Sequence, residues 1–159
     1  MDESGVNLAM TRRFGRAPRG ERVGGTLPQN YGANLTMMAA RSRRGLGATM
    51  AMEGATDTDA FQAYVEQLLG PTLRPGDMVV LGNVSAHTIA RVRDALESRA
   101  ARVVDLPPAS PGLSPSAQGR SKVKTSLRTA QARTREALEA GTQQALTTIT
   151  TADARRGFT

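Results

Sequence analysis

One short apolar run constrains the fold of this chain more than any other feature. Residues 78–81 read Met-Val-Val-Leu, Gly76 and Asp77 precede them, and a helical pattern begins just after His87. An uninterrupted apolar run that leads through a short loop into a helix is typical of a buried parallel strand in an α/β sheet. Functional groups in such sheets gather at the carboxyl ends of the strands, and here that end is Gly82.

Periodicity and turn signals predict the other elements. Two extended segments joined by the basic turn 41–45 indicate an antiparallel hairpin, and apolar residues spaced by three and four indicate helices. Strands are expected at 6–10, 34–40, 46–53, 78–81 and 101–106, and helices from the caps at 56–59 to the Gly70-Pro71 stop and at 88–100, 121–130 and 134–149. This order predicts an α/β fold with a mixed sheet whose last two strands are parallel and whose faces carry helices.

Length and irregular segments set the domain prediction. A chain of 159 residues is long enough for one domain with a real core. The proline-rich stretch 107–115 leaves no room for regular structure, and the polar last ten residues are expected to fray. We therefore expect one domain over residues 1–150 and a polar tail over 151–159.

Charge is distributed unevenly along the chain. Residues 1–47 hold eight Arg against three acids and residues 111–159 hold eight basic residues against three acids, whereas residues 48–110 have a net acidic excess. Two basic flanks indicate a polyanionic partner, most simply nucleic acid, although a solvated surface or a preference for Arg in a GC-rich genome is the competing interpretation. With no cysteine and one histidine, thiolate and multi-histidine metal sites are excluded, and no apolar run approaches a membrane span.

Three separated motifs resemble one family. The first is Asp2-Glu3-Ser4-Gly5 followed by a basic loop, the second is Val79-Val80-Leu81-Gly82-Asn83, and the third is the stretch 106–124, which begins Leu-Pro-Pro and includes Ser114-Pro115. In this order and spacing they resemble the catalytic domain of the mariner-type DDE transposases of bacterial insertion sequences (the six-thirty family). The resemblance covers almost the whole chain.

The resemblance implies an RNase H-like fold in which three carboxylates hold two magnesium ions. These ions activate water or a 3′-hydroxyl against a DNA phosphodiester. Magnesium takes oxygen ligands, and two ions about 4 Å apart clamp the attacking and the leaving oxygen. Because one strand cannot direct three carboxylates at one spot, the ligands have to come from separate elements.

Only one of the three family carboxylates is present. The first falls on Asp2, which is the expected catalytic and metal-binding residue at the end of the first strand. The second position holds Gly82 and the third holds Ala117. Asp77 lies about 16 Å away at the other end of its strand, and the family assigns no role to Asp105. We therefore expect that magnesium does not bind productively here.

The start of the chain departs from the family as well. Family members have apolar residues that lead into the first Asp and a helix-turn-helix region before them. Here Met1 immediately precedes Asp2, so the first strand is expected to be truncated, through a misplaced start or as a relic. The family also has a position that resembles His87, but a local packing or capping role is favoured for this residue.

These observations predict a transposase-derived protein that has lost metal-dependent DNA strand cleavage and transfer. The alternative is a non-catalytic DNA-binding or regulatory protein that occupies DNA, forms a homodimer or pairs with an active copy. A small-molecule enzyme is disfavoured because no glycine-rich phosphate loop joins a strand to a helix. A cytoplasmic protein that joins the nucleoid when bound to DNA is expected. The candidate DNA-binding residues are Arg12, Arg13, Arg16, Arg19, Arg22, Lys122, Lys124 and Arg128.

Overall fold

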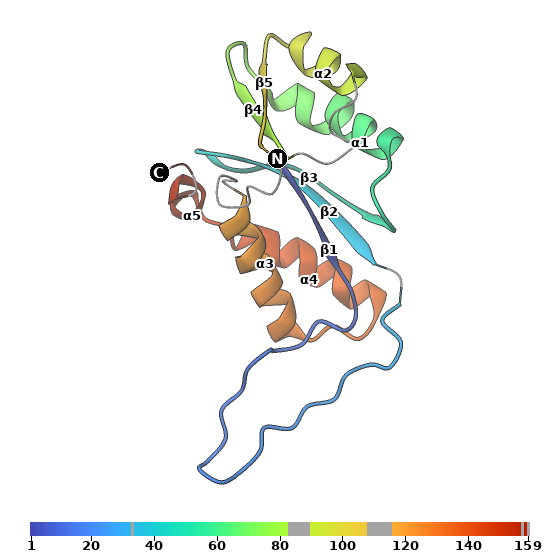
Figure 1. The fold of residues 1–159 in the computed structure, drawn as a ribbon, viewed down its shortest axis with the longest axis vertical. Coiled ribbons are helices and arrows are strands. Elements are labelled where there is room, and N and C mark those ends of the chain that lie inside the picture. Colours follow the sequence, from blue (N-terminus) through green and yellow to red (C-terminus); the bar gives the residue numbers. More distant parts are fainter. Residues whose placement is uncertain (33, 83–89, 108–115, 157, 159) are drawn as a thin grey trace.

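Five strands and five α-helices make up the computed structural model (Figure 1), which describes residues 1–32, 34–82, 90–107, 116–156 and 158, with the backbone alone at 2, 117 and 118. The strands are β1 (Asp2–Val6), β2 (Leu35–Ser42), β3 (Gly45–Glu53), β4 (Met78–Leu81) and β5 (Arg102–Asp105). The helices are α1 (Thr58–Tyr64), α2 (Ala90–Glu97), α3 (Ala117–Ala130), α4 (Arg135–Thr147) and α5 (Thr151–Arg156). A π-helical turn (Val65–Leu69) and a 3-10 turn (Gly70–Thr72) continue α1.

The strands form a three-stranded antiparallel sheet and a two-stranded parallel sheet, so both kinds of pairing that the sequence predicts are present. Strands β1, β2 and β3 pair antiparallel in that order, and β4 pairs parallel with β5. The two parts meet where the Met1 amino group donates a 2.9 Å hydrogen bond to the Val80 carbonyl oxygen. The start of β1 therefore lies between β2 and β4, and the sequence of strands across the fold is β3-β2-β1-β4-β5.

Alternation along β2 supplies both faces of the sheet with core residues. Met38 belongs to one apolar cluster with Phe61 and Tyr64, and its neighbour Met37 belongs to a second cluster with Val123 and Leu127. Successive residues of a strand point to opposite faces, so one strand anchors helices on both sides. Helices α1 and α2 cover one face, and α3 and α4 cover the other (Figure 1).

The predicted hairpin and helix cap are confirmed. Strands β2 and β3 are joined at Arg43 and Arg44, and Gly45 has a φ of +138°, a conformation that favours glycine. At the start of α1, the Asp57 side chain accepts a 2.8 Å hydrogen bond from the Ala60 N–H. The π-helical turn that continues α1 changes the residue spacing, and Leu68 within it is 38% exposed.

The strand predicted at 6–10 is wrong. Strand β1 covers Asp2–Val6, so Asp2 begins the first strand instead of ending it. Asp and Gly are poor strand formers, and the pairing of these residues with Ala39 to Leu35 of β2 overrides their local preference. The first strand is thus present and short.

Helix α3 begins four residues earlier than predicted, at Ala117. Its first turn packs against other elements, since a Cβ placed on Gly119 would lie 3.4 Å from the Arg41 guanidinium and 3.8 Å from Ile149. Tertiary contacts of this kind are not visible in a local sequence pattern. His87 and most of the proline-rich loop at 107–115 lie outside the described residues.

The end of the chain is not frayed through residue 156, because residues 151–156 form α5 and Ala154 is fully buried. Thr150 and Asp153 form a capping box. The Asp153 carboxylate accepts the Thr150 N–H at 2.9 Å, and Thr150 Oγ1 accepts the Asp153 N–H at 3.1 Å. Asp153 also pairs with Lys122 at 2.6 Å, so the tail is bound to α3.

Acid is expected to release α5 from α3. The hydrogen bond from Lys122 and those from Thr150 hold the pKa of Asp153 well below its usual range. A carboxyl whose pKa is lowered by folding contributes stability above its unfolded pKa of about 4, and loses it as the pH falls through the folded value. Hydrogen exchange of the amides at 153–156 should therefore speed up as the pH is lowered below about 4, relative to the amides of α4.

Asp153→Asn is the matched variant for this prediction. It removes the charge and keeps the shape, so exchange at 153–156 should be faster at neutral pH and lose most of its acid dependence. Equal acid dependence in the parent and in Asp153→Asn would contradict the assignment.

Among the described residues, none of the helices is long and apolar enough to cross a membrane.

Candidate active site and nucleic-acid interface

The fold brings together the chain segments that contain the three predicted carboxylate positions. Asp2 begins β1 and Gly82 follows β4, and the Met1–Val80 hydrogen bond joins these two segments. Ala117 is the first residue of α3. Met1, Val80 and Ser116 line one cleft, and each is one or two residues from one of the three positions. The sequence prediction that these positions come from separate elements and meet at one place agrees with this arrangement.

The residues at this place do not fit two magnesium ions. Gly82 has no side chain, and Ala117 is an alanine without an oxygen donor. The nearest carboxylate on the adjacent strand is Asp105, which forms an ion pair with Arg93 of α2. Within the described residues, no group of three or more His, Cys, Asp or Glu side chains is placed to hold a metal ion. Hard divalent cations need several oxygen ligands, so a two-metal mechanism has no support from this donor set.

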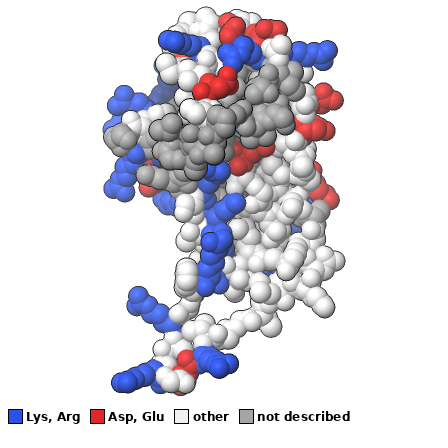
Figure 2. All heavy atoms as spheres, viewed as in Figure 1, with Lys and Arg blue, Asp and Glu red and all other residues white. Residues whose placement is uncertain are grey.

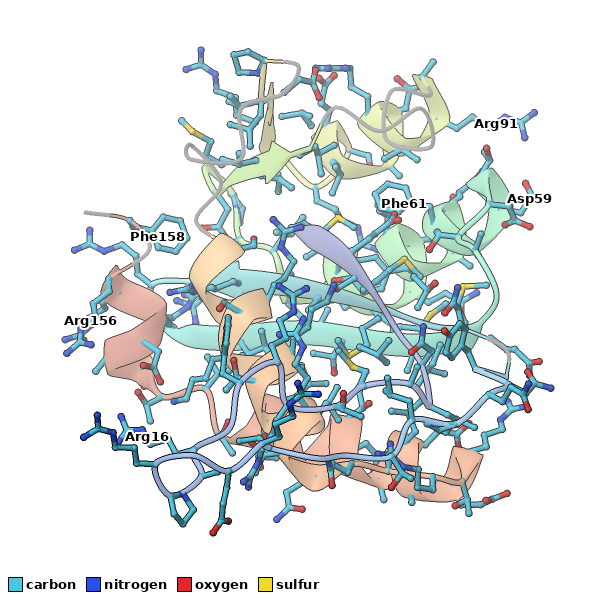
Figure 3. The ribbon with its side chains drawn as sticks, turned by 60° about the horizontal axis from the view of Figure 1, so that its bottom comes forward. Arg16, Asp59, Phe61, Arg91, Arg156 and Phe158 are labelled. Carbon is cyan, nitrogen blue, oxygen red and sulfur yellow. The ribbon has the colours of Figure 1, made fainter. Side chains whose placement is uncertain are left out.

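The five arginines of the first basic loop lie on an irregular segment that leaves β1 and returns to β2. This segment extends away from the body of the protein as a long arm (Figure 1), and Arg16 points outward from it (Figure 3). Every residue from 12 to 27 is exposed. Lys and Arg side chains run from the upper left edge down to this arm, whereas most Asp and Glu side chains lie toward the top and right (Figure 2).

The basic residues of α3 differ in how accessible they are for contact with a DNA phosphate. The Lys122 amine donates to the Thr148 carbonyl at 2.7 Å and to Asp153 at 2.6 Å, so a phosphate contact would have to compete with α5. Lys124 and Arg128 are half-buried. Among the candidates for DNA contact, the arm arginines are therefore more accessible than Lys122.

Sequence reasoning missed a second group of basic residues. Arg41, Arg43 and Arg44 at the β2–β3 turn and Arg74 before β4 line the same cleft as Met1. Burial lowers the pKa of Arg41, and the neighbouring Asp153 opposes this effect. The run Arg-Ser-Arg-Arg was a visible signal of a basic hairpin tip, but only the fold places Arg74 beside it.

Comparisons with known proteins agree with the fold. A family model described as DDE superfamily endonuclease matches residues 1–139. The chain superposes on the Mos1 strand transfer complex with a TM-score of 0.76 at 16% identity, covering 98% of this chain and 48% of that one. It superposes on the Mos1 mariner paired-end complex with Mn with a TM-score of 0.76 at 17% identity, covering 98% and 49%.

The isolated catalytic domain of Mos1 mariner transposase matches as well, with a TM-score of 0.68 at 18% identity over 78% of this chain and 67% of that domain. No curated protein sequence matches the chain. At these identities the likeness establishes the fold, which is the RNase H-like fold predicted from the motifs. The chain spans about half the length of the Mos1 chains in the DNA complexes.

Proposed function

Because this chain belongs to the DDE superfamily of endonucleases, we propose that it is a transposase-derived protein that binds DNA and lacks the strand-cleaving activity of its ancestors. The proposal rests on one observation above all. Two of the three positions that carry metal-binding carboxylates in the family hold Gly82 and Ala117, and the neighbouring Asp105 forms an exposed ion pair with Arg93. Asp2 remains as the only family carboxylate in this frame.

Loss of the carboxylates removes the chemistry and leaves the binding surface. A single carboxylate offers too few charged ligands to hold two divalent cations against water. The net charge of +7 and the exposed arm still attract a polyanion, because each neutralised phosphate releases condensed counterions. Mos1 was solved with transposon-end DNA, which supports DNA as the partner class here.

The proposal also covers the domain, the lineage, the metal and the mode of DNA binding. Residues 1–150 form a partial catalytic domain, and the lineage is that of bacterial insertion sequences. Magnesium served the ancestral reaction and is not bound productively by this copy. The protein binds duplex DNA through the arm and α3, associates with the nucleoid, and acts as a regulator by occupying DNA, as a homodimer or together with an active copy.

Arg16→Ala/Arg19→Ala is expected to weaken duplex binding about three- to tenfold at 50 mM salt and to lower the slope of log K against log salt by about two. Both arginines are exposed residues of the arm, and each phosphate contact contributes about one unit to that slope. Fluorescence anisotropy with a labelled 20-base-pair duplex across a salt series measures both quantities.

The matched control is Arg91→Ala/Arg102→Ala, which removes the same charge from exposed positions near α2 and β5. It should change the affinity less than twofold. Equal losses in the two variants would show that only net charge matters and would remove the arm from the interface. Magnesium-dependent nicking of supercoiled DNA by the parent protein, abolished by Asp2→Ala, would refute the proposed loss of activity.

A further inference from the structure

The arm carries exposed apolar side chains among its arginines. Phe14 is 90% exposed and belongs to neither apolar cluster of the core, whereas Phe61 is fully buried in one of them. Among the described residues, most of the large apolar side chains that are exposed lie on this one segment, namely Phe14, Val23, Leu27 and Tyr31. A group of exposed apolar side chains marks an interaction surface, so the ring of Phe14 is available to a ligand.

The tip of the arm has a defined shape. The Glu21 N–H donates a 3.0 Å hydrogen bond to the Pro18 carbonyl, which closes a turn. Behind this turn the two limbs of the arm touch, since a Cβ added to Gly15 would lie 2.5 Å from the Val23 side chain. Phe14 therefore lies next to the point where the limbs meet.

The base of the arm is attached to the body of the protein. One guanidinium nitrogen of Arg133, in the loop between α3 and α4, donates to the Leu8 carbonyl at 3.0 Å. The Leu8 N–H donates to the Tyr31 carbonyl at 3.4 Å. The side-chain amide of Asn7 donates to the side chain of Asn34 at 3.1 Å. These contacts hold the two ends of the arm together and present its tip away from the body (Figure 1).

The charge around Phe14 is almost entirely positive. Residues 7–34 contain five arginines and a single acid, and most charged side chains at the lower end of the arm are basic (Figure 2). Arg13 directly precedes the ring, and Arg12 and Arg16 lie two residues to either side. Two residues of chain span at most about 7 Å, so these guanidinium groups can reach the phosphates on both sides of a base that lies on the ring.

An aromatic ring among arginines fits an unpaired base better than a paired one. In a duplex the neighbouring bases cover both faces of each base, whereas an unpaired base offers a π-face to the ring. Arginines alone are sufficient for contacts with duplex phosphates, since these contacts are electrostatic and need no apolar surface. An exposed ring with basic neighbours is instead the arrangement that binds single strands.

We propose that the tip of the arm binds an unpaired segment of a DNA strand, with one base stacked on Phe14 and the adjacent phosphates on Arg12, Arg13 and Arg16. A gap, a bubble or a free single-stranded end supplies such a segment. The inference rests on the proposed function, because it names the form of DNA that the arm prefers.

The lack of tryptophan makes Phe14→Trp a specific reporter of stacking. The chain contains no Trp, so the new side chain is the sole source of tryptophan emission, and a base stacked on it quenches that emission. Titration with a 20-nucleotide oligothymidylate, in buffer without divalent metal, should quench the emission by at least about half. Leu27→Trp is the matched control, because Leu27 is also on the arm and 62% exposed, and it should be quenched less than half as strongly. Equal quenching in the two variants would overturn the proposal.

Affinity measurements separate stacking from charge. In fluorescence anisotropy, Phe14→Ala should bind the labelled oligothymidylate at least about tenfold more weakly than the parent and a 20-base-pair duplex within twofold of the parent. The slope of log K against log salt should not change, because no cation is removed. Phe14→Leu keeps apolar bulk without the aromatic face and should lose nearly as much affinity for the single strand.

The same titrations distinguish failure of this inference from failure of the proposed function. If the parent binds the duplex and Phe14→Ala binds the single strand as tightly as the parent does, the stacking role of Phe14 is wrong and the proposed function stands. Equal losses for duplex and single strand would identify the ring as a wedge between paired bases and would also overturn the inference. A parent protein that binds neither form would refute the proposed function and the inference together.

Discussion

Replacing Gly82 with Asp and Ala117 with Glu is expected to raise the affinity of the chain for Mn²⁺ by at least about tenfold. The substitutions add two carboxylates at the end of β4 and the start of α3, where the fold also brings the segment of Asp2. Divalent cations bind more tightly as the number of charged oxygen ligands rises. Isothermal titration calorimetry with Mn²⁺ and with Mg²⁺ measures the change, and nicking of supercoiled DNA shows whether activity returns with it.

A control variant has to carry the same added charge at a different place. Gly24→Asp/Ala140→Glu does so, because Gly24 lies on the exposed arm and Ala140 is exposed on α4. It should leave Mn²⁺ affinity within twofold of the parent. Asp2→Ala in the doubly substituted chain should remove most of the gain. If the gain survives this change, Asp2 is not a ligand and its carry-over from the family is wrong.

Tyr64→Ala is expected to destabilise the protein by about 3–5 kcal/mol, the range for removing a large buried side chain from a core. The Tyr64 side chain is fully buried, belongs to the cluster with Met38 and Phe61, and donates a 2.8 Å hydrogen bond to the Ala48 carbonyl of β3. Its loss removes the contact between the end of α1 and the hairpin. Urea denaturation followed by circular dichroism gives the change in unfolding free energy.

Tyr64→Phe separates the hydroxyl from the ring and should cost only about 1 kcal/mol. Burial raises the pKa of the Tyr64 phenol well above its ordinary value. Since the neutral form is favoured in the folded state, this group contributes stability below pH of about 10 and loses it as the pH rises further. Similar losses in the Phe and Ala variants would show that the hydrogen bond, and not packing, dominates at this site.

Most of the fold was predictable from local patterns. The strand at 78–81, the hairpin with its basic turn and the helices around Phe61 and Leu138 all have strong periodicity or turn signals, and each is present. The predictions that failed concern segments whose secondary structure is determined by tertiary contacts. Strand β1 starts at Asp2 because β2 pairs with it, and the polar tail is helical because Thr150 and Asp153 cap it against Lys122.

For the candidate site too, some features could be predicted from the sequence and others required the structure. The motif frame predicts the three family carboxylate positions at Asp2, Gly82 and Ala117 without the structure, because family position is a property of sequence order. It did not reveal that Arg93 forms an ion pair with Asp105, that Asp153 of α5 forms an ion pair with Lys122, or that Arg74 lines the same cleft as the hairpin tip. These are contacts between residues far apart in the chain, and no local spacing encodes them.

The sequence alone determines the family and the α/β class, because these follow from residue identity and short-range order, and it predicts that two of the three family carboxylates are absent. Only the tertiary structure decides that the segments of Met1, Val80 and Ser116 line one cleft. The Met1–Val80 hydrogen bond joins the antiparallel sheet to the parallel sheet. Backbone pairing between distant segments therefore decides which residues share this cleft, whereas residue identity along the chain decides the family.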